Sequence, residues 1–357
     1  MKHIAFAVLF AALVVTSTNA QKGWTWCCTS HEEFLKCESI LRRNDPDINC
    51  HEEDGTENCA NRIKDRTADM MFMDGGDIFR YHRWLKVVVA EDYGEGDASY
   101  YAVAVAKSDL PSHVSMLALE GMKSCHTGVG KTSGWNTPIG WIARNRGVMN
   151  SRGQVQLYDP FTVSCAPGAN IASYQNIIPN AGGQKWCALC IGNNKGDHIC
   201  ERDSDELYYG YKGALQCMKD GMGDIAFVKH TTATDDEDKN NFILLCPDGS
   251  RKHPDEWRDC NLAKVPAHGL VMNKPTEVEA TKIYNMLEDL RKRLGNQEMF
   301  GDKRDLLWKS STKAFLFKFD SAVNYLGAEY YCNMLVLNGM NLLHTKGCFN
   351  RTSDGRT

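Results

Sequence analysis

The stretch Ser124-Cys-His-Thr-Gly-Val-Gly-Lys-Thr-Ser-Gly-Trp135 decides how the rest of the chain is interpreted. A glycine-rich turn leads into a lysine and two hydroxyl residues, and then into a helical pattern of apolar residues at Trp135, Ile139 and Ile142. The backbone N–H groups of such a turn, with the positive end of a helix dipole behind them, form a binding site for a small anion. The sequence therefore predicts an anion pocket in this stretch.

A nucleotide-binding P-loop is the first alternative, because Gly-Val-Gly-Lys-Thr matches the end of the Walker A pattern. That pattern needs a glycine five positions before the second glycine, and this position is Cys125. A cysteine that is prone to form a disulfide argues against a nucleotide loop. The expected ligand is therefore smaller than a nucleotide.

The N-terminal residues predict the compartment. Lys2 and His3 precede an apolar run from Ile4 to Val15, and small residues follow up to Ala20. This pattern indicates a secretory signal peptide at residues 1–20, too short for a membrane anchor. The polar tail at 350–357 does not resemble a GPI signal. We therefore expect a secreted, extracellular protein without a membrane anchor.

Composition excludes one class of partner and favours a disulfide-bonded fold. The net charge of −4 leaves no basic face for nucleic acid or an anionic membrane. Fifteen cysteines in a secreted chain indicate disulfides, and the odd number leaves at least one thiol unpaired or linked to a partner.

Apolar strand patterns alternate with helical patterns along the chain, which predicts an α/β fold. Helices are expected after the capping residues Ser30 and Thr276, and further helical stretches near 315–326 and up to Leu343. Strands are expected at residues 68–73, 85–90, 100–105, 224–228 and 265–272.

Several residues in or beside these strands are candidates for a site, although each has an ordinary explanation. Asp74, before two glycines, would cap a helix, and Tyr100 and His268 would be core residues with satisfied polar atoms. The pair Cys187 and Cys190 has the spacing of a redox pair or half a zinc site. No second such pair follows, so we interpret both cysteines as part of the disulfide framework.

Taken together and in order, these residues resemble one lobe of a transferrin, from Cys27 to roughly Leu343. The resemblance rests on Asp74 before glycine, Ser99–Val105, Cys125–Gly130 with Gly134-Trp-Asn136, Tyr209–Gly213, Asp220–His230 and Val265–His268. It implies a periplasmic-binding-protein-like lobe of two subdomains with a metal cleft between them. Residues 21–99 with 268–357 would form subdomain 1, and residues 100–267 subdomain 2.

The resemblance also implies the site. The metal ligands would be Asp74, Tyr100, Tyr211 and His268, a donor set that suits Fe³⁺. A carbonate (bicarbonate) anion would complete the iron coordination, held by Thr127, Lys131, Ser133 and Gly134. A lysine pair, Lys229 and Lys309, would meet across the closed cleft and trigger iron release in acid.

This chain departs from the family at Lys131, where an arginine is usual, and at Arg144 and Gly168, where cysteines are found. Lysine keeps the charge but lacks the planar fork that grips carbonate, so we expect weaker anion and iron retention. The implied disulfides are Cys27–Cys59, Cys37–Cys50, Cys125–Cys217, Cys165–Cys190, Cys187–Cys200 and Cys246–Cys260. Cys28 is left as the odd thiol, and Cys348 needs another partner, for which Cys332 is available.

The expected function is that of a secreted, monomeric, single-lobe transferrin that binds one Fe³⁺ with carbonate for iron transport or iron withholding. It would not be an enzyme, and the sequence leaves open whether a cell-surface receptor is a partner. The alternative is a transferrin-fold protein that binds a protein partner instead of iron, as a carbonic anhydrase inhibitor would. The sequon at Asn350 predicts a glycosylation site.

Overall fold

The computed structural model describes residues 23–94, 96–148, 150–151, 154–181, 183–193, 195–301 and 304–339. The predicted signal peptide (1–20), Cys348 and the Asn350 sequon lie outside these residues. Within the described ranges, no helix has both the length and the apolar character needed to cross a membrane.

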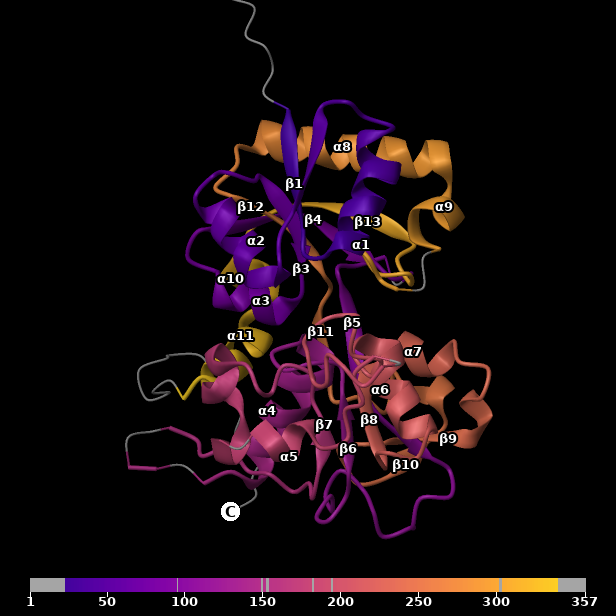
Figure 1. Ribbon diagram of the computed structural model, residues 1–357. Coiled ribbons are helices and arrows are strands. Elements are labelled where there is room, and N and C mark those ends of the chain that lie inside the picture. Colours follow the sequence, from indigo (N-terminus) through magenta and orange to yellow (C-terminus); the bar gives the residue numbers. More distant parts are fainter. Residues whose placement is uncertain are drawn as a thin grey trace, which may run out of the picture.

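The first of two β-sheets has six strands in the order β13-β4-β12-β3-β1-β2. These strands are β1 (Trp24–Cys28), β2 (Ile48–Glu52), β3 (Met70–Met73), β4 (Leu85–Asp92), β12 (Gly269–Asn273) and β13 (Ala314–Ser321). The long helix α8 (Glu277–Leu294) lies across one end of this half of the molecule, beside β13 and β4 (Figure 1). We call the part built on this sheet subdomain 1.

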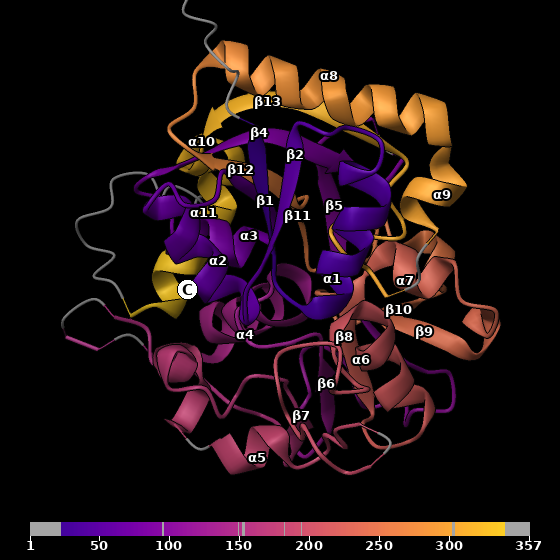
Figure 2. The ribbon, with the colours of Figure 1, turned by 45° about the horizontal axis from the view of Figure 1, so that its top comes forward.

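The second sheet has seven strands, in the order β10-β9-β5-β8-β6-β7 with β11 paired to β5. These strands are β5 (Ser99–Lys107), β6 (Ser124–His126), β7 (Ser164–Cys165), β8 (Ile225–Lys229), β9 (Phe242–Leu245), β10 (Arg251–Lys252) and β11 (Ala263–Pro266). We call the part built on it subdomain 2. Figures 1 and 2 show the two halves one above the other, joined by a few chain crossings.

The helices divide between the two subdomains. In subdomain 1 they are α1 (His31–Lys36), the π-helical turn η1 (Cys37–Arg42), α2 (Gly55–Lys64), α3 (Gly75–Arg80), α8, α9 (Asn296–Phe300) and α10 (Ala322–Leu326). In subdomain 2 they are η2 (Thr132–Asn136), α4 (Thr137–Arg146), η3 (Ala172–Ile177), η4 (Pro179–Ala181), α5 (Gly183–Cys187), α6 (Gly210–Lys219), α7 (His230–Thr234), η5 (Lys239–Asn241) and η6 (Pro254–Glu256). The alternation of strands and helices confirms the predicted α/β class.

Two predictions were wrong in detail, the single strand at 265–272 and the helical stretch at 315–326. The apolar run at 265–272 is two strands, β11 in one sheet and β12 in the other, with Ala267 and His268 between them. A run that is buried on both faces carries no periodicity that could indicate the break. The stretch 315–326 is mostly the strand β13, which pairs with β4, and only then the short helix α10. The alternation of Phe315, Phe317 and Phe319 was the strand signal.

The chain passes between the sheets after β4 and again between β11 and β12. The last described helix, α11 (Ala328–Leu337), follows subdomain 1 in the sequence but packs on α4 and η2 of subdomain 2. Asn333 Nδ2 in α11 donates a hydrogen bond to the carbonyl oxygen of Asn136 at 2.9 Å. The end of the described chain is therefore a third connection between the halves.

Six disulfides with both cysteines among the described residues stabilise the fold, and they join the same pairs that the resemblance implies: Cys27–Cys59, Cys37–Cys50, Cys125–Cys217, Cys165–Cys190, Cys187–Cys200 and Cys246–Cys260. Cys332 is disulfide-bonded as well. Cys28 is a buried free thiol, and its burial raises its pKa. Cys187 and Cys190 belong to different disulfides, so they are not a redox pair.

Candidate metal and anion site

Asp74 stands where β3 ends and α3 begins, and its two carboxylate oxygens have different roles. Oδ1 accepts hydrogen bonds from the Gly76 N–H (2.9 Å), the Thr132 N–H (2.7 Å) and the Thr132 hydroxyl (2.6 Å). Oδ1 is therefore the helix cap of α3 and also a contact to subdomain 2. Oδ2 is buried and has no hydrogen-bond partner among the described residues.

The imidazole of His268 faces this free oxygen. Its Nε2 lies 3.2 Å from Asp74 Oδ2, and the side chains are only 7% and 5% exposed. The two atoms lack good hydrogen-bond geometry, and within the described structure neither has another partner. The hydroxyl of Tyr325 donates to the Ala267 carbonyl oxygen at 2.9 Å and fixes the backbone beside His268. Buried polar atoms normally have a hydrogen-bond partner. An oxygen and a nitrogen that lack one and face each other could both coordinate one metal ion.

Tyr100 and Tyr211 complete the group. Tyr100 is the second residue of β5 and fully buried, and Tyr211 lies in the first turn of α6. Their hydroxyl oxygens are 3.1 Å apart. The ring centroids of Tyr211 and His268 are 6.5 Å apart. Four side chains from both subdomains and the crossing between them thus converge at one buried place.

Burial and charge set the protonation of these groups. Burial raises the pKa of Tyr100 and of Tyr211, and the nearby Asp74 charge raises both further. Burial would also raise the pKa of Asp74, but contacts from His268 and Thr132 outweigh it and lower that pKa. Burial lowers the pKa of His268, aided by Lys309. At neutral pH the carboxylate is therefore charged and the imidazole neutral, whereas the phenols carry protons that a metal must displace.

The predicted anion pocket lies beside these residues. Thr127 is fully buried, and in the described structure its hydroxyl has no hydrogen-bond partner. A Cβ atom at Gly134 would lie 2.0 Å from that hydroxyl oxygen, so only glycine leaves room there. Ser133 and Gly134 are in the first turn of η2, where N–H groups lack intrahelical partners. A buried hydroxyl and helix-terminal amides therefore lie together where the anion site is predicted.

Lys131 is the cation predicted for the anion site. Its Nζ lies 4.1 Å from the centre of the Tyr209 ring. Burial, aided by the positive charge of Arg202, lowers the pKa of Lys131 to about 8. Tyr209 and Arg202 were not predicted as site residues. Tyr209 stands two residues before the predicted ligand Tyr211. This closeness in the sequence could have indicated that Tyr209 lies near the site.

Lys229 and Lys309 lie near each other, and both also lie near the ring of Tyr211 and the carboxylate of Asp305. The Lys229 and Lys309 Nζ atoms lie 4.7 Å and 5.9 Å from the centre of the Tyr211 ring. Lys229 Nζ also donates a hydrogen bond to the Ser311 hydroxyl of subdomain 1. Both lysines lower the pKa of Asp305 to about 2 against the effect of its burial. The sequence analysis missed this carboxylate.

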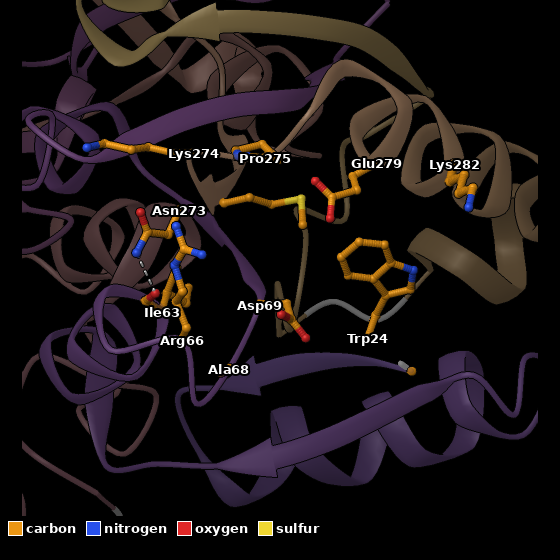
Figure 3. A pocket seen from close by; sticks show the side chains of 12 residues that line it. Trp24, Ile63, Arg66, Ala68, Asp69, Asn273, Lys274, Pro275, Glu279 and Lys282 are labelled. Carbon is orange, nitrogen blue, oxygen red and sulfur yellow. Dashed lines mark hydrogen bonds between the residues drawn. The ribbon is translucent and has the colours of Figure 1, made fainter. Parts of the chain in front are cut away.

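Two other features carry no site. Cys165, Cys190 and Glu206 cluster like metal ligands, but the sulfurs are bonded to each other. Glu206 Oε2 accepts hydrogen bonds from the backbone N–H groups of Gly192 and Cys200, each with an N···O distance of 2.8 Å. A pocket of about 350 Å³ opens at the start of β3, the end remote from Asp74 (Figure 3). Its Asp69 and Asn273 already bond to the protein backbone.

A lobe of two sheets, with a carboxylate, an imidazole and two phenols buried between them, is the architecture of a two-subdomain binding protein. The chain belongs to the transferrin family, whose profile it matches over residues 24–339. This family consists of non-enzymatic transport proteins.

Relatives extend over most of this chain. Serotransferrin-1 of Salmo salar is 37% identical over 92% of the chain, and serotransferrin of Oryzias latipes is 36% identical over 92%. Human melanotransferrin is 35% identical over 85%. The match covers 46%, 46% and 44% of these relatives, so the chain spans about half their length.

Proposed function

We propose that the protein binds one Fe³⁺ together with a carbonate anion in the cleft between its subdomains. The observation that carries this proposal is the unsatisfied pair of Asp74 Oδ2 and His268 Nε2, 3.2 Å apart and buried. A folded protein does not normally leave two such atoms facing each other without a partner. A metal ion between them, after a small outward shift of each, would satisfy both.

The donor set suits ferric iron. A carboxylate and two phenolates supply three negative charges on hard oxygen atoms, and the imidazole adds a nitrogen. Four protein ligands leave two positions of an octahedron open for a bidentate anion. We assign that anion to the pocket of Thr127, Lys131, Ser133 and Gly134, which lies directly beside the ligands. Since both phenols are protonated without metal, iron binding should release protons.

The biological role that follows is extracellular transport or withholding of iron by a secreted, monomeric lobe. Membership of a family of transport proteins and the disulfide-rich fold support it.

A titration with Fe³⁺, with and without bicarbonate, tests the proposal. Phenolate-to-iron charge transfer should colour the protein when both are present, at one iron per chain. Tyr100→Phe should lose this absorption. Tyr101→Phe is the matched control, because Tyr101 points to the other face of β5 and packs on Trp257 with ring centroids 4.6 Å apart. A wild-type protein that stays colourless would refute iron binding and would favour a role in binding a protein partner.

A further inference from the structure

Arg202 of subdomain 2 makes a buried ion pair with Asp77 of subdomain 1. Its Nη2 lies 3.3 Å from Asp77 Oδ2, and the side chains are 8% and 7% exposed. Asp77 is in α3, the helix that Asp74 caps. A contact on this helix therefore lies one turn from a proposed iron ligand.

The same guanidinium also contacts the loop of residues 127–131, which leads into the proposed anion site and is called the anion loop below. Arg202 Nε donates to the carbonyl oxygen of Val129 at 2.8 Å, between Gly128 and Lys131. The guanidinium carbon lies 5.0 Å from the centre of the Tyr174 ring, and that of Arg80 in α3 lies 4.9 Å from it. Arg202 thus connects α3 of subdomain 1, the anion loop and η3 of subdomain 2.

The chain around Arg202 is built to hold it. The Cys187–Cys200 disulfide fixes the preceding segment, and the N–H of Gly168 donates to the Cys200 carbonyl oxygen at 2.7 Å. A Cβ atom at Gly168 would lie 2.9 to 3.2 Å from the Arg202 stem, at a φ of +90°. The glycine that replaces a family cysteine here therefore makes room for the arginine side chain.

Opening of the cleft would separate Arg202 from Asp77. Breaking a buried, hydrogen-bonded charge pair is costly, because each charge loses its partner. The guanidinium of arginine is also always charged in proteins. The contact is therefore suited to resist opening of the cleft.

We propose that Arg202 is a positioning residue which, through Asp77 and Val129, locks the anion loop to the Asp74 helix and slows the release of the bound metal. This inference rests on the proposed iron binding. It predicts that Asp77 and Arg202 act as one unit on iron retention while the four ligands stay intact.

The test is a double-mutant cycle of Asp77→Asn and Arg202→Gln, with Lys185→Gln as the control. Lys185 pairs with the buried carboxylate of Asp159 at 2.6 Å, but both belong to subdomain 2. Iron release to a chelator is measured near neutral pH and near pH 5, and small-angle X-ray scattering gives the radius of gyration. Each single variant should release iron roughly 5- to 150-fold faster, and the double variant no faster than the singles. Arg202→Lys, which keeps the charge but not the Val129 contact, should lie in between.

We call the contacts of Arg202 with Asp77 and Val129 the latch. Equal iron release rates in wild type and all variants, or additive effects of the two changes, would overturn the proposal that the latch slows metal release. Iron-dependent colour must persist in the variants, since the ligands are untouched. If the wild type itself binds no iron, the proposed function fails, and the latch is judged by scattering of the metal-free proteins alone. Asp77→Asn and Arg202→Gln should then be more expanded than wild type and Lys185→Gln, and equal radii would overturn it.

Discussion

Gly76→Ala should prevent complete closure of the cleft without harming the fold. A Cβ atom at Gly76 would lie 1.8 Å from the Gly130 carbonyl oxygen and 2.5 Å from Asn136 Nδ2. Gly76 belongs to subdomain 1, and both atoms belong to subdomain 2. The backbone carbonyl cannot rotate away as a side chain would, so the two halves must separate.

The separation needed is on the order of 1 Å, because packed atoms do not interpenetrate. That shift breaks the hydrogen bonds from the Thr132 N–H and hydroxyl to Asp74, now 2.7 and 2.6 Å long. Hydrogen bonds to a charged group each contribute about 1.5–3 kcal/mol. At roughly 1.4 kcal/mol for each factor of ten, iron affinity should fall at least about a hundredfold. Alanine inside a helix is favoured over glycine by about 0.8–1.0 kcal/mol, so the fold itself is not weakened.

Competition with a chelator measures the affinity, scattering measures the closure of the iron-loaded protein, and thermal unfolding of the metal-free protein is the control for folding. We expect an unchanged or higher unfolding temperature, a larger radius of gyration and weak iron binding. A Gly76→Ala protein with wild-type affinity and a wild-type radius would show that Gly76 does not lie against Gly130 and Asn136 in the iron-binding conformation.

Three further predictions concern the proposed site. Tyr211→Phe, like Tyr100→Phe, should abolish or greatly weaken Fe³⁺ binding with the fold intact by circular dichroism, and two unchanged affinities would remove the central claim. Lys131→Arg should lower the pH at which half of the iron is lost, and Lys131→Ala should raise it, whereas a single midpoint for all three proteins would contradict the anion assignment. Lys229→Ala should slow iron release in stopped-flow experiments, Lys309→Ala should do the same, and the double variant should add little; additive effects would show that the two lysines do not interact.

Much of the fold was predictable because local signals agreed with it. The capping box of Thr276 and Glu279 and the stop at Gly295 define α8 as the sequence indicated. The break at His268 was not predictable from periodicity, because the residues on both sides are buried in different sheets. The position of α11 on subdomain 2 depends on long-range contacts, such as Asn333 with Asn136, which no local pattern carries.

The candidate site shows the same division. Asp74, Tyr100, Tyr211 and His268 were named from ordered motifs, and the structure brings their side chains together. Arg202 and Asp305 were missed because neither stands in a recognisable motif. Each becomes relevant only through charges that are distant in the sequence, Asp77 for Arg202 and Lys229 for Asp305. Electrostatic partners across a cleft are a property of the closed fold, so a single sequence indicates them poorly.

The pKa of Lys229 changes how acid release should be understood. Burial lowers it from 10.5 to about 8, and the charge of Lys309 contributes. When the cleft opens, the pKa should return toward 10.5, so the charged lysine opposes closure fully below pH 8 and progressively less between pH 8 and 10.5. At pH 7 about nine-tenths of Lys229 is already protonated, so further acidification adds little charge.

The charge on Lys229 is therefore a nearly constant strain on the closed state rather than a switch between pH 7 and pH 5. Asp305, with a pKa of about 2, stays charged over the same range and offsets part of that strain. It follows that Lys229→Ala should slow iron release by a similar factor at pH 7 and at pH 5. The steep acid dependence must then come from protonation of the bound anion or of His268. A Lys229→Ala protein whose release is slowed only in acid would refute this order of events and would assign the trigger to the lysines.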